Sequence, residues 1–362
     1  MTHMNFTPDT IHAQTARRPA RAPEGVTRGR WARRLAATAF LAAAPLLTPA
    51  VAATQYVIGT NPVGSVYYTV GTNLAKLISD KLDIRSTVQP YSGSSIYLPL
   101  VNQGQLALGV SSALDGGLAF NGKADFRKLG QQKDLRTLVH LWNLSYTYVA
   151  RANSGMQTIA DLKGKKVAVG ISSNVSLGLA DEAYLKAGGV DPEKDIKAVT
   201  IGGLDDGFNK LQNGSIDATV SALGIPLMEQ AHNAIPGGVT ILDLTGPDAN
   251  SAFLDQQMSG LYLMPQAMDE RYPYVKKDLN ITGFDVFLVG SSHLAENDVY
   301  DIVKAIHTNW PQLQKDNPAL RKISQNDLSS PSNTIPYADG AIRFFKEIGQ
   351  WTDENEAREK AF

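Results

Sequence analysis

The stretch Ile58–Ser79, IGTNPVGSVYYTVGTNLAKLIS, passes from strand to helix within a few residues. It begins as an apolar strand, breaks into a loop that carries Gly64 and Ser65, and continues with apolar residues at helical spacing. A helix that starts directly after a strand presents unpaired backbone N–H groups at the end of that strand. The stretch therefore predicts one unit of an α/β fold, with a candidate ligand-binding loop at the junction.

Strand and helix patterns alternate along the rest of the chain, which at 362 residues is long enough for about two domains. Short loops between them predict an α/β fold of two lobes with mostly parallel sheets. We expect the chain to cross between lobes near 151–158 and again within 261–282, which places a hinged cleft between the lobes. Residues 135–142 and 145–152 look like two strands that meet at a turn, and residues 246–280 look irregular. The expected lobes are residues 54–152 with 268–362 (lobe 1) and 153–267 (lobe 2).

The N-terminus has the pattern of an export signal. The basic segment RGRWARR (28–34) precedes the apolar segment LAATAFLAAAPLLTPAVAA (35–53), which ends in small residues. We expect residues 1–53 to be a signal peptide for the general secretory route rather than the twin-arginine route. A membrane anchor is the less favoured alternative, because Pro45 and Pro49 interrupt the apolar segment. Later stretches stay below the roughly 18 apolar residues that a spanning helix needs, so we expect a soluble, extracytoplasmic protein.

Composition excludes several classes of protein. The sequence has no cysteine, so it forms no disulfide, thiolate nucleophile, iron–sulfur cluster or lipid-modified N-terminal cysteine. Without residues 1–53, which hold seven arginines and two acids, the net charge is −6. This acidic balance argues against nucleic acid or an anionic membrane as a partner.

Four junctions between a strand and a helix share serine and glycine residues. A helix N-terminus carries a partial positive charge, and neighbouring hydroxyls add donors, so several such junctions at one cleft can bind a carboxylate without arginine. Taken singly, each serine is better explained as a helix N-cap; the four together favour a site. One of the two adjacent tyrosines of the first junction is expected either in the core or as an aromatic wall of the cleft. The junctions are Thr60–Tyr68, Tyr91–Ser95, Val110–Gly117 and Ile171–Ser176.

Motifs for catalysis or metal binding do not stand out. The six histidines are scattered without metal-ligand spacing, and there is no G-x-S-x-G motif. The paired acids Asp205 and Asp206 are interpreted as first-turn helix residues. We therefore expect a protein that is not an enzyme and has no metal and no cofactor. A Ser/His/Asp triad from distant residues stays open, since its members need not be adjacent in sequence.

Five segments together resemble the TAXI family of periplasmic solute-binding proteins, which serve TRAP transporters. The resemblance covers about 55–351. The segments are IGTNPVGSVYYTVGTNLAKLI (58–78), YSGSSIYLPLVNQGQLALGV (91–110), VARANSGMQTIADLKGKKVAVG (149–170), GGLDDGFNKLQNGSIDATVSALGIP (202–226) and DGAIRFFKEIG (339–349).

The resemblance implies a type II periplasmic-binding-protein fold and a periplasmic receptor. Such a receptor binds a small carboxylate such as glutamate or 2-oxoglutarate, and delivers it to a sodium-coupled TRAP permease in the membrane. A monomer is expected. The ligand-binding residues carried over by motif are Ser65, Tyr67, Tyr68, Ser94, Ser95, Ser111, Ser112, Ser172, Ser173, Asn174, Ser176, Gly224 and Pro226.

Two loops depart from the family pattern. The third junction reads SSALDGG (111–117) where the family has a motif like Q-S-D, and the loop SSNVSLGL (172–179) has less glycine and threonine than usual. Glutamate is therefore not assumed as the ligand. The remaining alternatives are a binding protein for another transporter, a partner of a membrane sensor, and an exported hydrolase that pairs Ser65 or Ser111 with a histidine.

Overall fold

A computed structural model describes residues 55–362, which belong to one compact unit. The expected signal peptide, residues 1–53, lies outside the described residues. Ten strands form one mixed sheet. The strands are β1 Gln55–Thr60, β2 Arg85–Pro90, β3 Leu108–Ser112, β4 Leu135–Arg151, β5 Lys166–Ile171, β6 Lys197–Ile201, β7 Ala218–Ala222, β8 Val239–Ile241, β9 Leu261–Gln266 and β10 Leu279–Ser291.

The helices alternate with the strands in the first two thirds of the described chain and follow one another near its end. The α-helices are α1 Val66–Leu82, α2 Ser94–Asn102, α3 Ala113–Phe120, α4 Val175–Ala187, α5 Leu204–Gln212, α6 Pro226–Ala234, α7 Ser251–Gln257, α8 Glu296–Thr308, α9 Trp310–Asp316, α10 Asp339–Glu347 and α11 Asp353–Glu359. The short 3-10 helices are η1 Ala124–Phe126, η2 Ala152–Ser154, η3 Ile159–Leu162, η4 Pro318–Lys322 and η5 Gln325–Asp327.

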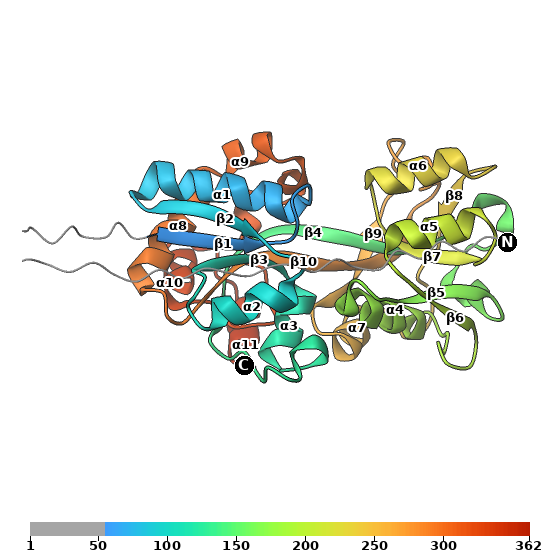
Figure 1. Ribbon diagram of the computed structural model, residues 1–362, viewed down its shortest axis with the longest axis horizontal. Helices are drawn as coiled ribbons and strands as arrows, with labels where there is room; N and C mark the ends of the chain where they lie inside the picture. The colour runs from blue at the N-terminus through green and yellow to red at the C-terminus, as the bar shows by residue number, and fades with distance from the viewer. Residues whose placement is uncertain (1–54) are drawn as a thin grey trace, which may run out of the picture. The chain divides into compact units, whose positions relative to one another are not determined.

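The strand order explains how two lobes share a sheet. The order is β2-β1-β3-β10-β4-β7-β5-β6, with β8 on β4 and β9 on β10. Strands β1, β2 and β3 are parallel to one another, as are β5, β6 and β7. The long antiparallel strands β4 and β10 join the two groups and run through both (Figure 1). We call the group around β1–β3, with α1–α3 and α8–α11, lobe 1, and the group around β5–β8, with α4–α7, lobe 2.

Strand β4 corrects one expectation from the sequence. The two strands expected at 135–142 and 145–152 are one strand of 17 residues, without a turn. Asn143 pairs with Asp285 of β10 and Leu144 pairs with Phe284, so the ladder continues through the polar positions that suggested a turn. Register shifts on either side of Phe287 and Leu288 absorb the mismatch along this length.

The segment 246–280 also differs from its expected irregular structure. It contains helix α7, whose N-cap Asn250 accepts a hydrogen bond from Phe253 N at 2.9 Å, and strand β9, which pairs with β10. The strand signal is weak because β9, LYLMPQ, contains Pro265, which removes a backbone donor.

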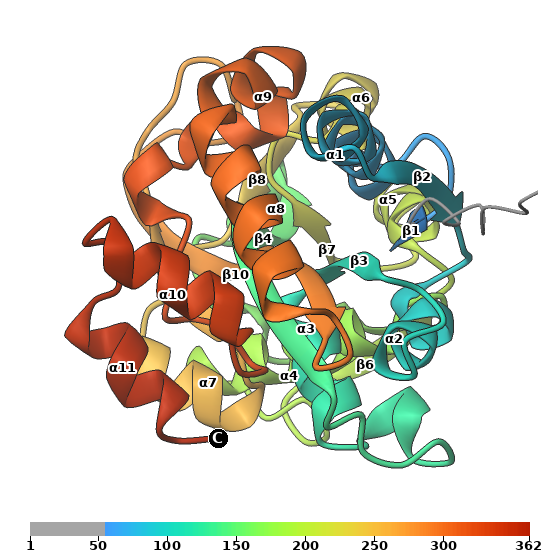
Figure 2. The ribbon, with the colours of Figure 1, turned by 90° about the vertical axis from the view of Figure 1, so that its left-hand side faces the viewer.

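The core of lobe 1 follows from helical spacing. Val70, Leu74 and Ile78 lie on one buried face of α1 and pack with Ile58 of β1. Figure 2 shows α8 and α10 next to each other beside β4 and β10, and buried residues of α8, α10 and both strands belong to the same cluster as α1. Among the described residues, no helix has the length and apolar character needed to cross a bilayer.

Candidate functional site

One small cavity lies where the fronts of helices from both lobes meet. Its volume is about 110 Å³. Lobe 1 contributes the loops after β1 and β2, the first residues of α2, helix α3 and η1. Lobe 2 contributes the loop between β5 and α4 and the first residues of α4. The lining residues are Asn61, Pro62, Ser92, Gly93, Ser94, Ser95, Asp115, Leu118, Ala124, Asp125, Phe126, Ser173, Asn174, Val175 and Ser176.

The front of α2 provides donors on the lobe 1 side. The N-cap is Gly93, which has no side chain to bind the first backbone N–H groups. Ser94 and Ser95 occupy the first two helical positions, are partly buried and line the cavity. Their N–H groups precede the first position that an intrahelical bond can reach, so they can donate to a ligand together with the two hydroxyls.

The front of α4 faces the cavity from lobe 2. Asn174 is the N-cap and its Oδ1 accepts from Leu177 N at 3.1 Å. The hydroxyl of Ser176, which is 4% exposed, donates to the same Oδ1 at 2.8 Å. Ser173 and Val175 complete this side of the cavity.

A carboxylate, Asp115, lies at the meeting point of these serines. Its backbone N donates to the Ser112 hydroxyl at 3.1 Å, and that hydroxyl donates to the Asp115 carboxylate at 2.8 Å. Burial raises the pKa of Asp115, while the nearby hydroxyls of Ser176, Ser112 and Ser94 oppose that rise. Hydroxyls from both lobes therefore lie close to a single acid.

The structure brings together part of the predicted site. Five of the predicted residues line the cavity, and the acid between them is supported by a sixth. The five are Ser94, Ser95, Ser173, Asn174 and Ser176, and the sixth is Ser112.

The predicted residues of the first junction lie outside this lining. Ser65 caps α1 by accepting from Tyr68 N at 3.2 Å, which is the ordinary structural role of a serine at this position. The ring of Tyr67 packs against Trp142 with centroids 5.1 Å apart, and burial raises the pKa of its hydroxyl. Tyr68 is partly buried in the first turn of the same helix.

The other predicted residues are also placed away from the lining. Ser111 is buried in β3 and donates to Ser112 O at 3.2 Å. Ser172 is exposed before α4, and its backbone N donates to Ile201 O at 2.9 Å. Gly224 lies next to the ring of Tyr272, and Pro226 starts α6.

Sequence reasoning missed Asp115, Asp125, Asn61 and Phe126 of the lining. Asp115 stands three residues after an N-cap serine, a position where acids are favoured for helix stability alone, so its spacing carried no signal for a ligand. Phe126 is buried in a 3-10 helix, and only the fold brings it near the serines. No histidine lines the cavity, and residues 55–362 contain no group of acids and histidines that could hold a metal ion.

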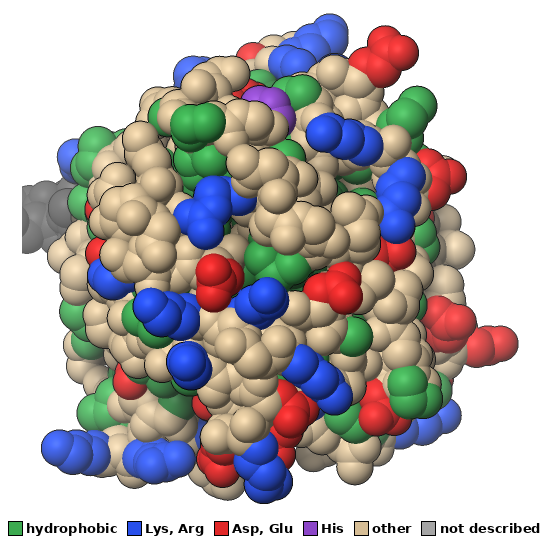
Figure 3. Space-filling view, turned by 90° about the vertical axis from the view of Figure 1, so that its right-hand side faces the viewer, with side chains coloured by type: hydrophobic (Ala, Val, Ile, Leu, Met, Phe, Trp, Pro, Cys, Tyr) green, Lys and Arg blue, Asp and Glu red, His purple; other side chains and the backbone are tan. Residues whose placement is uncertain are grey.

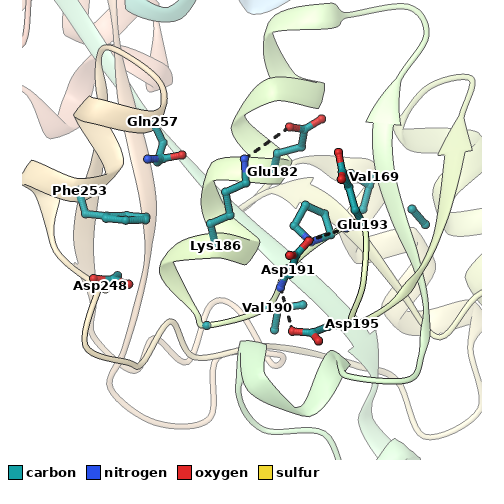
Figure 4. Close-up of a pocket in the computed structure, with 13 residues that line it drawn as sticks. Val169, Glu182, Lys186, Val190, Asp191, Glu193, Asp195, Asp248, Phe253 and Gln257 are labelled. Atoms are coloured by element: carbon teal, nitrogen blue, oxygen red, sulfur yellow. Dashed lines mark hydrogen bonds and ion pairs between the residues drawn. The ribbon is translucent and has the colours of Figure 1, made fainter.

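A wider and more open hollow of about 800 Å³ lies on lobe 2, between the C-terminal half of α4 and α7 (Figure 4). Glu182 and Lys186 form an ion pair with N and O atoms 3.9 Å apart, and Asp191 pairs with Lys194 at 2.6 Å. The hollow contains none of the residues predicted from sequence, and its side chains mostly pair with their own neighbours. We therefore take the smaller cavity as the candidate site.

The sequence matches one protein family, and the fold resembles solved structures of solute-binding proteins. The model of the NMT1-like family matches residues 58–349. A TctC solute-binding protein from Polaromonas is 14% identical, with a TM-score of 0.50, over 86% of this chain and 98% of that chain. PhnD1 from Prochlorococcus marinus, solved with methylphosphonate, is 14% identical over 82% and 99%, with a TM-score of 0.49. Of these two, the Polaromonas protein supports the two-lobed α/β fold.

Proposed function

Because the chain belongs to the NMT1-like family, we propose that it is a periplasmic solute receptor that binds a small carboxylate between its lobes. The observation that carries this proposal is the convergence of serines from both lobes, with the front of α2, on one cavity. Oriented N–H groups and hydroxyls hold a carboxylate without a fixed cation. The solute-binding protein from Polaromonas with the same fold supports this class of function.

The proposed mechanism is closure of two lobes around the ligand. We propose residues 54–152 and 268–362 as lobe 1 and residues 153–267 as lobe 2, joined by β4 and β10. Ligand enters the open cleft, and closure brings Ser173 and Ser176 of lobe 2 against Ser94 and Ser95 of lobe 1. We further propose that the closed form is recognised by a sodium-coupled TRAP permease, to which the solute is released.

The face of the molecule at the lobe 2 end fits a diffusing receptor better than a nucleic-acid or membrane binder. On the face shown in Figure 3, at the lobe 2 end, acidic and basic side chains are interspersed rather than gathered by sign. Binding to a polyanion needs a basic face or stripe. We propose export to the periplasm by the segment 1–53 and a monomeric state.

Isothermal titration of the purified protein tests the binding proposal. The panel contains succinate, 2-oxoglutarate, L-glutamate, acetate, propionate, glycine and L-alanine. We expect saturable heat with at least one carboxylate, and loss of affinity of about tenfold or more in Ser95→Ala/Ser176→Ala, which removes one lining hydroxyl from each lobe. Ser215→Ala, in the exposed turn before β7, is the matched control and should bind like the unmodified protein.

Two results would count against the proposal. Absence of heat and of a thermal shift across the whole panel would reject carboxylate binding. Equal affinity of the double variant and the control would show that the ligand binds at another place. The transporter class needs a separate measurement, namely sodium-dependent uptake of the bound solute by vesicles that contain the permease, with and without this protein.

A further inference from the structure

We propose that the cleft selects a small, net-neutral zwitterion, whose ammonium group pairs with Asp115 while its carboxylate lies at the front of α2. This inference rests on the proposed receptor function and narrows its ligand class. It is carried by the charges that line the cavity.

The charge of the cavity is of one sign. Among its lining residues, Asp115 and Asp125 are acids, and none is lysine, arginine or histidine. A dicarboxylate would bring two negative charges to a site that already holds two acids and offers only hydroxyls and N–H groups. Like charges at a few ångströms in a partly dehydrated site repel strongly, so dianions are disfavoured.

Asp115 lacks a cationic partner of its own. Within residues 55–362 no basic side chain lies within ion-pair distance of it, whereas surface acids such as Asp80, Asp191 and Asp206 are each paired with a lysine. Its neighbours are the hydroxyls of Ser94, Ser112 and Ser176, and the nearby Asp125 carboxylate disfavours its charge further. An acid withdrawn from water without a counter-ion is costly, and a ligand ammonium supplies the missing charge.

The two halves of a zwitterion match two different parts of the lining. Donors are gathered at the front of α2, where Gly93 leaves the N–H groups of Ser94 and Ser95 free of a side-chain cap. The acceptor is Asp115, whose carboxylate lies near the hydroxyls of Ser94 and Ser176 and is therefore adjacent to that helix front. An α-amino acid carries its ammonium and carboxylate on one carbon, so it fits donors and acceptor that lie side by side.

The cavity volume sets the size of the ligand. About 110 Å³ corresponds to roughly four water molecules at about 30 Å³ each. Buried Leu118 and Phe126 bound the space on the lobe 1 side. Glycine, alanine and serine are of this size, whereas glutamate adds both length and a second negative charge.

Matched ligand pairs test the inference. Isothermal titration compares glycine, L-alanine and L-serine with acetate, propionate and 3-hydroxypropionate, which lack only the ammonium group, and with L-glutamate and succinate. We expect at least one of the three amino acids to bind about tenfold or more tightly than its partner without nitrogen, and than L-glutamate and succinate, which each carry two carboxylates.

The variant Asp115→Asn gives a signature that misfolding does not. It should lose about tenfold or more in affinity for the amino acid, and should gain affinity for the matching acid, because a negative charge near the carboxylate is gone. Asp80→Asn, an exposed change of the same type on α1, is the control and should alter neither. Circular dichroism and thermal melting establish that both variants are folded.

Three outcomes overturn the inference. If acetate, propionate, succinate or L-glutamate bind as tightly as the amino acids, the zwitterion is rejected while the proposed carboxylate receptor stands. If nothing in the panel binds, both fail together. An Asp115→Asn protein that is folded and keeps its full preference for the amino acid also rejects the role of Asp115.

Discussion

At the scale of single residues, Asp181 is a buried acid whose pKa is raised. It is fully buried in α4, where it accepts from the Tyr146 hydroxyl at 2.7 Å and from Gly170 N at 3.2 Å. Burial outweighs these donors and raises its pKa to about 8. The acid is therefore protonated in the folded protein at a pH where the unfolded chain has already lost the proton.

This raised pKa predicts a pH dependence of stability. Between about pH 4 and about pH 8 the folded state binds one more proton than the unfolded state, so the free energy of unfolding falls as the pH rises, by up to about 1.4 kcal/mol per pH unit. In Asp181→Asn this contribution disappears, so the free energy of unfolding should change less with pH between about pH 4 and about pH 8. Urea denaturation at several pH values measures it, with Asp80→Asn as the control. An unchanged slope in Asp181→Asn would contradict the prediction.

Asp285 of β10 is a buried acid whose pKa is lowered instead of raised. It lies in a hydrogen-bonded network that joins four segments. Its carboxylate accepts from Tyr262 of β9 at 2.7 Å and from Ser330 at 2.7 Å, is also bonded to Ser332, and forms an ion pair with His140 Nε2 of β4 at 3.4 Å. Burial alone would raise its pKa, but His140 and the hydroxyls lower it to about 2. Burial alone would lower the pKa of His140, which the Asp285 carboxylate raises instead.

The directions of the two pKa shifts determine how this pair contributes to stability at each pH. The contribution of Asp285 is present above the unfolded pKa near 3.8 and is lost as the pH falls through about 2. The contribution of His140 is complete below its unfolded pKa near 6.5 and is lost as the pH rises through the raised value.

Asp285→Asn leaves His140 without its partner and should lower the free energy of unfolding by about 3–5 kcal/mol at neutral pH. Below about pH 2 the Asp285 carboxyl of the unmodified protein is mostly protonated, so the side chain at position 285 is neutral in both proteins and their stabilities should differ less. A difference that stays constant with pH would refute the assignment.

At the scale of elements, helix α10 packs against α8 through a glycine. A Cβ added to Gly340 would lie 2.2 Å from Glu296 O and 2.8 Å from Tyr300 N, and both are backbone atoms that cannot rotate away. Gly340→Ala should therefore separate the two helices and lower stability by about 1–3 kcal/mol, despite the better helix propensity of alanine. Gly202→Ala is the control, since its Cβ meets its nearest atom at 3.7 Å. Equal melting temperatures of the two variants would show that the interface between α8 and α10 accommodates the added methyl group without loss of stability.

At the scale of the whole molecule, β4 and β10 are paired on both sides. Strand β4 pairs with β10, β7 and β8, and β10 pairs with β3, β4 and β9, whereas β2 and β6 stand at the ends of the strand order. Opening these central amides requires disruption of both lobes. Hydrogen exchange followed by mass spectrometry should therefore be slowest at 135–151 and 279–291 and faster in β2 and β6. Faster exchange in β4 and β10 than in β2 and β6 would show that the pairing between the lobes opens before either lobe unfolds.

The sequence predicted the architecture better than the site. Alternating patterns and loop lengths are local properties, so the two-lobed α/β fold, confirmed by the structure and by the Polaromonas protein, could be predicted. Ser94, Ser95 and Ser176 could be predicted to lie together because helix fronts in such folds share one edge, and the structure places all three in one lining. Asp115 was not, because an acid in a first helical turn looks the same whether it supports a helix or faces a ligand. Strand β4 was divided in error, since polar residues inside a central strand resemble a turn.

The continuous pairing of β4 with β10 also restricts how the cleft can open. Two antiparallel strands cannot slip past each other without exchanging every ladder bond at once, but they can bend and twist with those bonds intact. Opening is then confined to rotation, and translation of one lobe along the other is blocked. A membrane partner that distinguishes a loaded molecule from an empty one would then need to detect only the rotation of one lobe relative to the other.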